Sequence, residues 1–445
     1  MALTHRIQEF AGPLSNRDIR ANIGWLLSER GFRLIVSFLV SILLARYLGP
    51  PRLGILNYAL SLKTFFGAFV YMGLSGLLVR EIVRSPQEEP VLMGTTFVLK
   101  MLGAFLGFLI LATFAFVTDP AAGTEFMVVF IIGLSLFPGA FECIEFWFEA
   151  YVRSKYSAIA KNIGFTLSSG LKILLVFFNC GLVTIAVVSA LEFFLSGALL
   201  ALFYSHKGGK IKAWTFHLEK ALYLLSQSWI IILSGFLSMV YLKVDQVMLR
   251  FMAGTKGVGI YSVAAQISEV WYFIAISIAA SVFPRLIKLR KEDPALYHKN
   301  LQQVFDVLFV ISLTVAVIFQ ILAGRLVPLV YGEAYRETAV ILQIHIWAGI
   351  FMFQRALLSR WFFIEHALRF SLYSHGLGAL SNILLNLALI PVLEGRGAAV
   401  ATIISYGMSS YFFLFLWSMT RPMGRMITRS YMLPLRLYSK WRQGR

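Results

Sequence analysis

Apolar residues occur along this chain in long, nearly uninterrupted runs that short polar stretches separate. Residues 101–117, MLGAFLGFLILATFAFV, carry no charge and belong to a run long enough to cross a bilayer as a helix. Turn-forming residues mark the breaks, for example GPP at 49–51 and KEDP at 291–294. The pattern therefore predicts twelve helical spans, at residues 23–48, 54–79, 92–117, 124–150, 156–179, 182–204, 218–250, 257–284, 300–323, 337–364, 370–392 and 397–419.

Two short stretches, half the chain apart, repeat one another. Residues 49–59 read GPPRLGILNYA and residues 254–264 read GTKGVGIYSVA. A shift of 205 positions aligns Gly49, Gly54, Ile55 and Ala59 with Gly254, Gly259, Ile260 and Ala264. Six predicted spans separate the copies, so both point the same way, which predicts two six-helix lobes related by a parallel pseudo-two-fold repeat. Two tight turns that are similar without any wider repeat are the alternative.

Composition agrees with a multi-pass membrane protein. Hydrophobic residues make up 58% of the chain and charged residues 14%, unlike a water-soluble domain. The first 25 residues are polar and contain no apolar run, so we expect no cleavable signal peptide. Of the 40 Lys and Arg, 25 lie in the tails, loops and adjoining helix ends on the side of the N-terminus and 7 on the opposite side. This bias places both termini in the cytoplasm.

The connections between the predicted spans are too short to hold a folded domain, so function must reside among the helices. We expect a cytoplasmic N-terminal segment (1–22), an N-terminal six-helix lobe (23–204), a basic cytoplasmic inter-lobe loop (205–217), a C-terminal six-helix lobe (218–419) and a basic cytoplasmic tail (420–445). The tail adjoins a span, which favours anionic membrane lipids over nucleic acid as its partner.

Motifs for catalysis are missing from the sequence. It contains no HExxH, no GxSxG and no phosphate-binding GxxxxGK[ST]. Its two cysteines, Cys143 and Cys180, fit neither a disulfide framework nor a metal site. We therefore expect a transporter rather than an enzyme, with no metal or cofactor.

Charged residues inside the predicted spans are the candidate site residues, because each costs about 2.5–3.5 kcal/mol at mid-bilayer on insertion scales. Eight cations lie there, nearly balanced by seven acids. A plain interpretation pairs Glu29 with Arg33 and leaves Arg30 free, and snorkelling to the interface is an alternative for Lys172 and Lys243. Candidates for binding an anionic substrate are, in order, Arg30, Arg33 and Lys63, then Lys243, Lys172 and Arg355, and last Lys100 and Arg360.

Among the acids, Asp245 and Glu269 are the first candidates for ion coupling, since a buried carboxylate can exchange protons or hold a sodium ion. Glu142 and Glu145 of the fourth span are the second choice. A structural ion pair with a Lys or Arg of a neighbouring helix is an equally plain interpretation of Asp245 and Glu269.

Three segments together resemble a known family: WLLSERGFRLIVSFLVSILLARYLGPPRLGILNYALS (25–61), VYLKVDQVMLRFMAGTKGVGIYSVAAQISEVWYFI (240–274) and LVPLVYGEAYRETAVILQI (326–344). They are similar to the polysaccharide-transporter branch of the flippase superfamily that also contains multidrug exporters and lipid II flippases. Within it, the chain looks like a Wzx-type flippase of O-antigen or exopolysaccharide repeat units.

This resemblance implies a MATE-like fold. It implies that an oligosaccharide linked to undecaprenyl diphosphate moves from the inner to the outer leaflet of the cytoplasmic (inner) membrane, for O-antigen, capsule or exopolysaccharide biosynthesis. Alternating access driven by proton or sodium antiport is the implied mechanism, with a glycan polymerase and glycosyltransferases of the pathway as partners. The family's cationic cleft corresponds here to Arg30, Arg33, Lys63 and Lys243, and its acidic position to Asp245.

A glycan also needs neutral hydrogen-bonding groups, for which Asn57, Ser61, Asn382 and Asn386 are candidates, although small polar residues more often join helices. Three alternatives remain open. A multidrug or cation antiporter of the same fold would favour acids, against which Arg30 and Arg33 argue. Lipid II flippases usually carry two further C-terminal spans, and a non-transporting scaffold for glycan assembly gives no reason to bury eight cations.

Overall fold

The computed structural model describes residues 16–119 and 123–443, with side chains from residue 31 onward except at 437 and 440–443. Every regular element in these ranges is a helix. Nine helices are long and apolar enough to cross a membrane, and the bent pair Glu333–His345 and Ala348–Ile364 makes a tenth. Two of the nine, Gly31–Arg84 and Leu368–Phe415, contain a kink, at Gly49 and at Glu394. Counting their halves separately gives twelve spans in the described part of the chain, as the hydrophobic pattern predicts.

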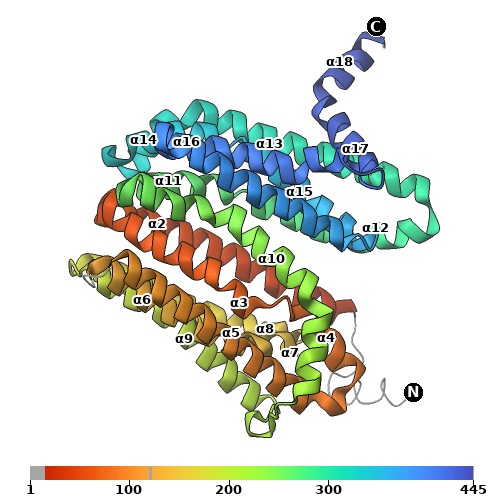
Figure 1. The fold of residues 1–445 in the computed structure, drawn as a ribbon. Coiled ribbons are helices and arrows are strands. Elements are labelled where there is room, and N and C mark those ends of the chain that lie inside the picture. Colours follow the sequence, from red (N-terminus) through yellow and green to blue (C-terminus); the bar gives the residue numbers. More distant parts are fainter. Residues whose placement is uncertain (1–15, 120–122, 444–445) are drawn as a thin grey trace. The chain divides into compact units, whose positions relative to one another are not determined.

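The chain divides into two compact units, residues 1–236 and 237–445. In Figure 1 the helices of the first unit, from red to light green, are α2 (Asn16–Phe66), α3 (Ala68–Tyr71), α4 (Ser75–Arg84), α5 (Glu89–Thr118), α6 (Thr124–Leu134), α7 (Glu142–Ala150), α8 (Ser154–Phe177), α9 (Leu182–His206) and the start of α10 (Leu218–Met252). The second unit contains the rest of α10 and α11 (Gly254–Glu269), α12 (Tyr272–Glu292), α13 (Pro294–Tyr331), α14 (Arg336–His345), α15 (Ala348–Ile364), α16 (Leu368–Ser410), α17 (Arg421–Tyr431) and α18 (Leu433–Gln443).

The boundary between the units falls inside α10, beyond the basic loop 205–217. The first part of α10 packs within the first unit through an ion pair, a hydrogen bond and a close approach at a glycine. Lys220 Nζ lies 2.6 Å from Glu88 Oε2, and the Tyr223 hydroxyl donates to Glu81 Oε1 at 3.3 Å. Near the middle of the helix, a Cβ added to Gly73 would lie 2.6 Å from Ile231 Cγ2, so only a glycine admits this approach.

Helix α5 uses glycines in the same way on one face. A Cβ at Gly103 would lie 2.1 Å from the Phe69 carbonyl oxygen, and one at Gly107 would lie 2.9 Å from that of Phe66. Small residues let membrane helices approach closely, because van der Waals packing has to replace the hydrophobic effect there. Lys100, one turn before Gly103, therefore enters the protein interior with this face and has no exposed surface.

Three breaks in the helices of each unit have a residue with positive φ, and they occur in the same chain order. The first is Gly49 (φ +69°) and Gly254 (φ +72°), the pair that the sequence repeat aligns. The second is Val152 (φ +54°) after α7 and His366 (φ +52°) after α15. In both, the next residue's N–H reaches back five residues, Arg153 to the Phe148 carbonyl at 2.7 Å and Ala367 to that of Phe362 at 2.8 Å.

The third pair is Asn179 (φ +52°) after α8 and Glu394 (φ +47°) inside α16. Positive φ is costly for residues other than glycine, so non-glycine residues rarely adopt it. Each unit thus has three of these positive-φ residues in the same chain order. This indicates that the two units are built as a repeat, which the sequence alignment of one pair of turns could not decide.

Interruptions inside the spans recur as well. Helix α2 ends at Phe66 and is followed by α3, and the 205-residue shift carries Phe66 onto Trp271, between α11 and α12. The fourth span is broken at a 3-10 turn, Phe137–Phe141, and its counterpart is bent by 51° between α14 and α15. A broken helix exposes backbone groups inside a membrane, which is tolerated only where protein or water surrounds them.

We predict that Gly49→Ala destabilises the protein by about 1–3 kcal/mol, because with φ +69° and ψ 170° the residue occupies a region that is essentially restricted to glycine. The surrounding space is open at this position, so the cost comes from the backbone alone. Thermal unfolding of the detergent-solubilised protein measures the effect.

Gly170→Ala is the matched control, since it also lies in open space but within the regular helix α8. There the substitution should stabilise the protein by up to about 1 kcal/mol. Equal unfolding temperatures for the two variants would contradict the assigned turn.

Candidate substrate and coupling sites

Two cations of the first unit share one carboxylate. Arg33 Nη2 on α2 lies 3.2 Å from Glu192 Oε1, and Lys172 Nζ on α8 lies 3.6 Å from Glu192 Oε2. Glu192 belongs to α9 and is 8% exposed, so the three charges meet in the interior of the unit. The Arg33 guanidinium also lies 4.9 Å from the centre of the Phe165 ring. One negative charge thus compensates two positive ones.

Lys63 on α2 adds a third cation to this region. Its Nζ lies 3.1 Å from the centre of the Phe193 ring, the residue that follows Glu192. Glu142 and Glu192 attract its charge electrostatically. Among the described side chains, however, no carboxylate lies within ion-pair distance of Lys63 Nζ. An aromatic face stabilises an ammonium group less than a carboxylate does, so the positive charge of Lys63 remains available.

Two of the three carboxylates of α7, those of Glu142 and Glu145, are paired with lysines. Lys100 Nζ lies 3.0 Å from Glu142 Oε2 and also donates to the Val70 carbonyl at 3.0 Å. Lys161 Nζ lies 2.6 Å from Glu145. Lys100 and Lys161 thus each have a carboxylate of their own, whereas Arg33, Lys63, Lys172 and Glu192 lie together. We call these four residues the unit 1 cluster.

The side chains of Glu29 and Arg30 lie outside the described residues, although the backbone of both belongs to α2. The prediction for Arg30 therefore stays a prediction.

Lys243 of the second unit is paired with an acid. Its Nζ lies 3.1 Å from Glu269 Oε2, and both side chains are about one quarter exposed, 26% each. The ion pair joins α10 to α11. The structure therefore brings together a residue predicted to bind substrate and one predicted to bind the coupling ion.

Asp245 has neutral partners instead. It is 3% exposed and accepts hydrogen bonds from the Tyr261 hydroxyl and, at 2.7 Å, from the Gln246 backbone N–H. The Tyr261 hydroxyl also lies 3.1 Å from Thr402 Oγ1 on α16. No cation lies within 4 Å of this carboxylate in the described part of the chain. Asp245 thus joins α10, α11 and α16 through hydrogen bonds that depend on its own protonation.

Arg355 on α15 is a buried cation that sequence reasoning ranked low. It is 3% exposed and donates to Ser374 Oγ at 2.7 Å, Ser371 Oγ at 3.1 Å and the Ser409 carbonyl at 3.2 Å. Its Nη2 lies 2.6 Å from His375 Nε2, and no acid among the described residues pairs with it. Neutral acceptors of α16 therefore surround it.

The predicted glycan-binding residues fall into two classes. Asn382 and Asn386 are fully buried in α16; Asn382 donates to Ser405 Oγ at 3.2 Å and Asn386 donates to Asn382 Oδ1 at 3.0 Å. Since Ser405 follows the kink at Glu394, the bond from Asn382 joins the two halves of α16, whereas the bond from Asn386 lies within the first half. Ser61 is also buried, at 4%, whereas Asn57 is half-buried.

Sequence reasoning missed two features. Lys100, ranked last, is fully buried, and the glycines three and seven residues after it could have indicated its inward face. His375 was not singled out, although Ser371, Ser374 and His375 lie together on α16 opposite Arg355. The guanidinium of Arg360 on α15, also ranked last, lies 5.3 Å from the centre of the Phe283 ring.

Comparison with solved structures identifies the fold. The chain is similar to the lipid II flippase MurJ in its inward closed conformation, with a TM-score of 0.68 and 15% identity over 94% of this chain and 93% of that one. It is also similar to a multidrug resistance MATE family transporter of the MOP superfamily in its inward-facing conformation, with a TM-score of 0.60 and 15% identity over 88% of this chain and 95% of that one. The predicted all-α, MATE-like fold is confirmed.

Sequence comparison identifies the family. The chain is 26% identical over 176 residues to the probable flippase AglR of Haloferax volcanii, a match that spans 39% of this chain and 37% of AglR. Residues 19–290, well over half of the chain, match the family described as polysaccharide biosynthesis protein. This membrane protein belongs to the polysaccharide biosynthesis protein family, as the resemblance of its three segments indicates.

Proposed function

We propose that this protein is a flippase that moves an undecaprenyl-diphosphate-linked oligosaccharide from the inner to the outer leaflet of the cytoplasmic membrane, for O-antigen, capsule or exopolysaccharide assembly. Membership of a polysaccharide biosynthesis family supports the pathway. The flippase named among its relatives and the fold it shares with MurJ support the type of reaction. Both termini lie in the cytoplasm in this proposal, where glycosyltransferases complete the substrate, and a polymerase receives it outside.

The observation that carries the proposal is the excess of positive charge in the unit 1 cluster. Arg33 and Lys172 share the Glu192 carboxylate, and Lys63 has no carboxylate within ion-pair distance among the described side chains, whereas Lys100, Lys161 and Lys243 each have one. Charges within a membrane protein are costly and are retained where they bind something. A diphosphate is the part of the substrate that supplies the missing negative charge, and guanidinium groups bind phosphate oxygens with two parallel hydrogen bonds.

An organic cation would be repelled by the same residues. A multidrug exporter of this fold would need an unpaired acid near its substrate, but Glu192 already has two cationic partners. The charge of the cluster therefore favours the lipid-linked diphosphate over a cationic drug.

The coupling acid that we propose is Asp245, with a proton or sodium ion as the coupling ion. Glu269, Glu142 and Glu145 are each neutralised by a lysine, so losing their charge would leave a cation unpaired. Asp245 has no such partner among the described residues and accepts a hydrogen bond from Tyr261 of α11, whose hydroxyl also contacts Thr402 of α16. Binding a cation at this carboxylate changes its hydrogen bond with Tyr261, and so changes the contact between α10, α11 and α16.

We predict that the double substitution Arg33→Gln with Lys63→Gln lowers the rate of flipping about a hundred- to ten-thousandfold, since each of the two lost charged hydrogen bonds contributes roughly 1.5–3 kcal/mol. Folding should be retained, because Lys172 still pairs with Glu192. The assay follows translocation of a defined lipid-linked oligosaccharide in proteoliposomes.

Lys210→Gln with Lys212→Gln is the control, since it removes two exposed charges from the loop of the same unit. Wild-type flipping by the Arg33 and Lys63 variant would exclude the cluster as the diphosphate site. Transport of ethidium in place of the oligosaccharide would instead favour a multidrug exporter.

We predict that Asp245→Asn removes the dependence of flipping on an imposed proton or sodium gradient and leaves slow exchange that needs no gradient. Glu269→Gln should act differently, lowering the yield of folded protein because Lys243 loses its partner. Lys243→Met combined with Glu269→Gln should restore that yield. Both gradients are imposed on proteoliposomes that contain equal amounts of folded protein.

Unchanged gradient dependence in the folded Asp245→Asn variant would move the coupling site to Glu142 or Glu145. Gradient dependence lost in the folded double variant of Lys243 and Glu269 would assign coupling to that ion pair.

A further inference from the structure

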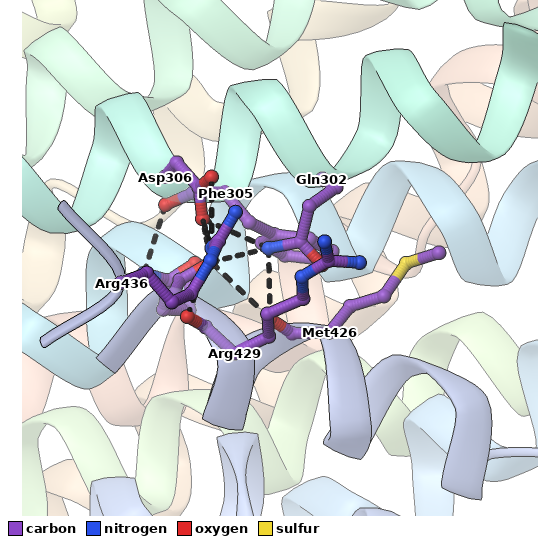
Figure 2. A network of polar contacts seen from close by, with 8 residues as sticks. Gln302, Phe305, Asp306, Met426, Arg429 and Arg436 are labelled. Carbon is purple, nitrogen blue, oxygen red and sulfur yellow. Dashed lines mark hydrogen bonds and ion pairs between the residues drawn. The ribbon is translucent and has the colours of Figure 1, made fainter. Parts of the chain in front are cut away.

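A pocket of about 530 Å³ lies between the beginning of α13 and the last two helices of the chain. Basic residues dominate its lining: His298 and Lys299 from α13, Arg425 and Arg429 from α17, and Arg436 from α18. Figure 2 shows the polar network that forms one wall. All these residues belong to the second unit and none takes part in the sites proposed above.

The single acidic residue that lines the pocket, Asp306, is already neutralised. Its carboxylate accepts hydrogen bonds from Gln302 Nε2 at 2.8 Å and from Ser430 Oγ at 2.7 Å, and lies 3.2 Å from Arg436 Nη1 (Figure 2). Arg436 also donates to the Arg429 carbonyl at 3.1 Å, which attaches the start of α18 to α17. The network thus holds α13, α17 and α18 together around the pocket. It also neutralises the carboxylate of Asp306.

Three exposed cations remain, Lys299, Arg425 and Arg429. No acidic side chain in the described ranges lies within ion-pair distance of any of them. Arg425 and Arg429 are one helical turn apart on the same face of α17, an arrangement of like charges that destabilises a helix unless an anion lies between them. The opposite face of α17, with Met423 and Ile427, is buried against the protein, so the arginines cannot turn away.

The length of α13 places the pocket at the membrane surface. Its 38 residues extend about 57 Å, whereas the hydrocarbon core is about 30 Å thick. The apolar part of the helix begins after Asp306, so His298 and Lys299 lie in the part that exceeds the hydrocarbon. In the segment that follows Arg429, Met432, Leu435 and Tyr438 are at least half exposed. Cations beside exposed apolar side chains fit a ligand that has both a phosphate and acyl chains.

We propose that this pocket binds the phosphate headgroup of an anionic phospholipid of the surrounding leaflet, with Lys299, Arg425 and Arg429 as its ligands. Bound there, the lipid would hold α17 and α18 against the beginning of α13. The proposal is independent of the flippase function, because it uses none of the residues assigned to the transported substrate or the coupling ion.

The test counts phosphatidylglycerol molecules retained by the full-length, detergent-solubilised protein in native mass spectrometry, with phosphatidylcholine as the uncharged comparison. We expect one tightly bound phosphatidylglycerol in the wild type. Arg425→Gln with Arg429→Gln should bind it about thirtyfold more weakly, given the usual contribution of a basic residue near a membrane surface. Lys288→Gln with Arg369→Gln, two exposed cations of the same unit that do not line the pocket, should bind like the wild type.

Equal retention of phosphatidylglycerol by the Arg425 and Arg429 variant and the wild type would overturn the proposal. A second arm adds glycerol 1-phosphate as a competitor. If only a large excess of glycerol 1-phosphate displaces the lipid, the acyl chains contribute to binding, which supports a lipid site. Displacement at equimolar concentration would overturn the assignment to a lipid and indicate a site for soluble phosphate compounds.

Discussion

The cost of placing a charge inside a membrane protein constrains most of what this chain does with its polar residues. A buried ion without a partner costs several kcal/mol, so each span cation has to be stabilised by some neighbour. The structure uses three kinds of neighbour. Lys100, Lys161 and Lys243 each have a carboxylate, Lys63 lies over an aromatic ring, and Arg355 is surrounded by hydroxyl, carbonyl and imidazole groups. Only the carboxylates cancel the charge, and the cations that lack one mark where an anion can be bound.

Helix interruptions decide which of these groups can meet. The residues of the unit 1 cluster come from α2, α8 and α9, and Lys63 lies just before the end of α2 at Phe66. In the second unit, Asp245 and Thr402 both reach Tyr261, two turns along α11 from Gly254. A kink with positive φ redirects the chain without a long loop, so the polar groups stay on rigid helices. Such kinks occur in both units, so both units position their polar groups in the same way.

The hydrophobic pattern predicts the spans and their breaks because those depend on local composition, and Gly49 and Gly254 could be aligned by sequence alone. Ion pairs could not be predicted in the same way. Arg33 and Glu192 are 159 positions apart, and their contact depends on how α2 and α9 are rotated. The sequence shows how deep along a span a charged residue lies. It does not show which face of the helix points to the protein interior, because nearly all the surrounding residues are apolar. That is why Lys100 was ranked last, and why the burial of Asn382 and Asn386, which are separated by one helical turn, needed the structure.

Lys243, Asp245 and Glu269 illustrate what the structure adds. All three are charges near the repeated turn, and the sequence left open whether Asp245 or Glu269 forms an ion pair with a base of a neighbouring helix. The structure pairs Lys243 with Glu269 and leaves Asp245 with Tyr261 and Gln246. A paired carboxylate cannot lose its charge without stranding a lysine, whereas a carboxylate held by neutral donors can gain a proton and keep its place in the core. A structural ion pair therefore differs from a coupling site in whether the acid is paired with Lys243. The rotation of α10 and α11 about their axes determines which acid that is.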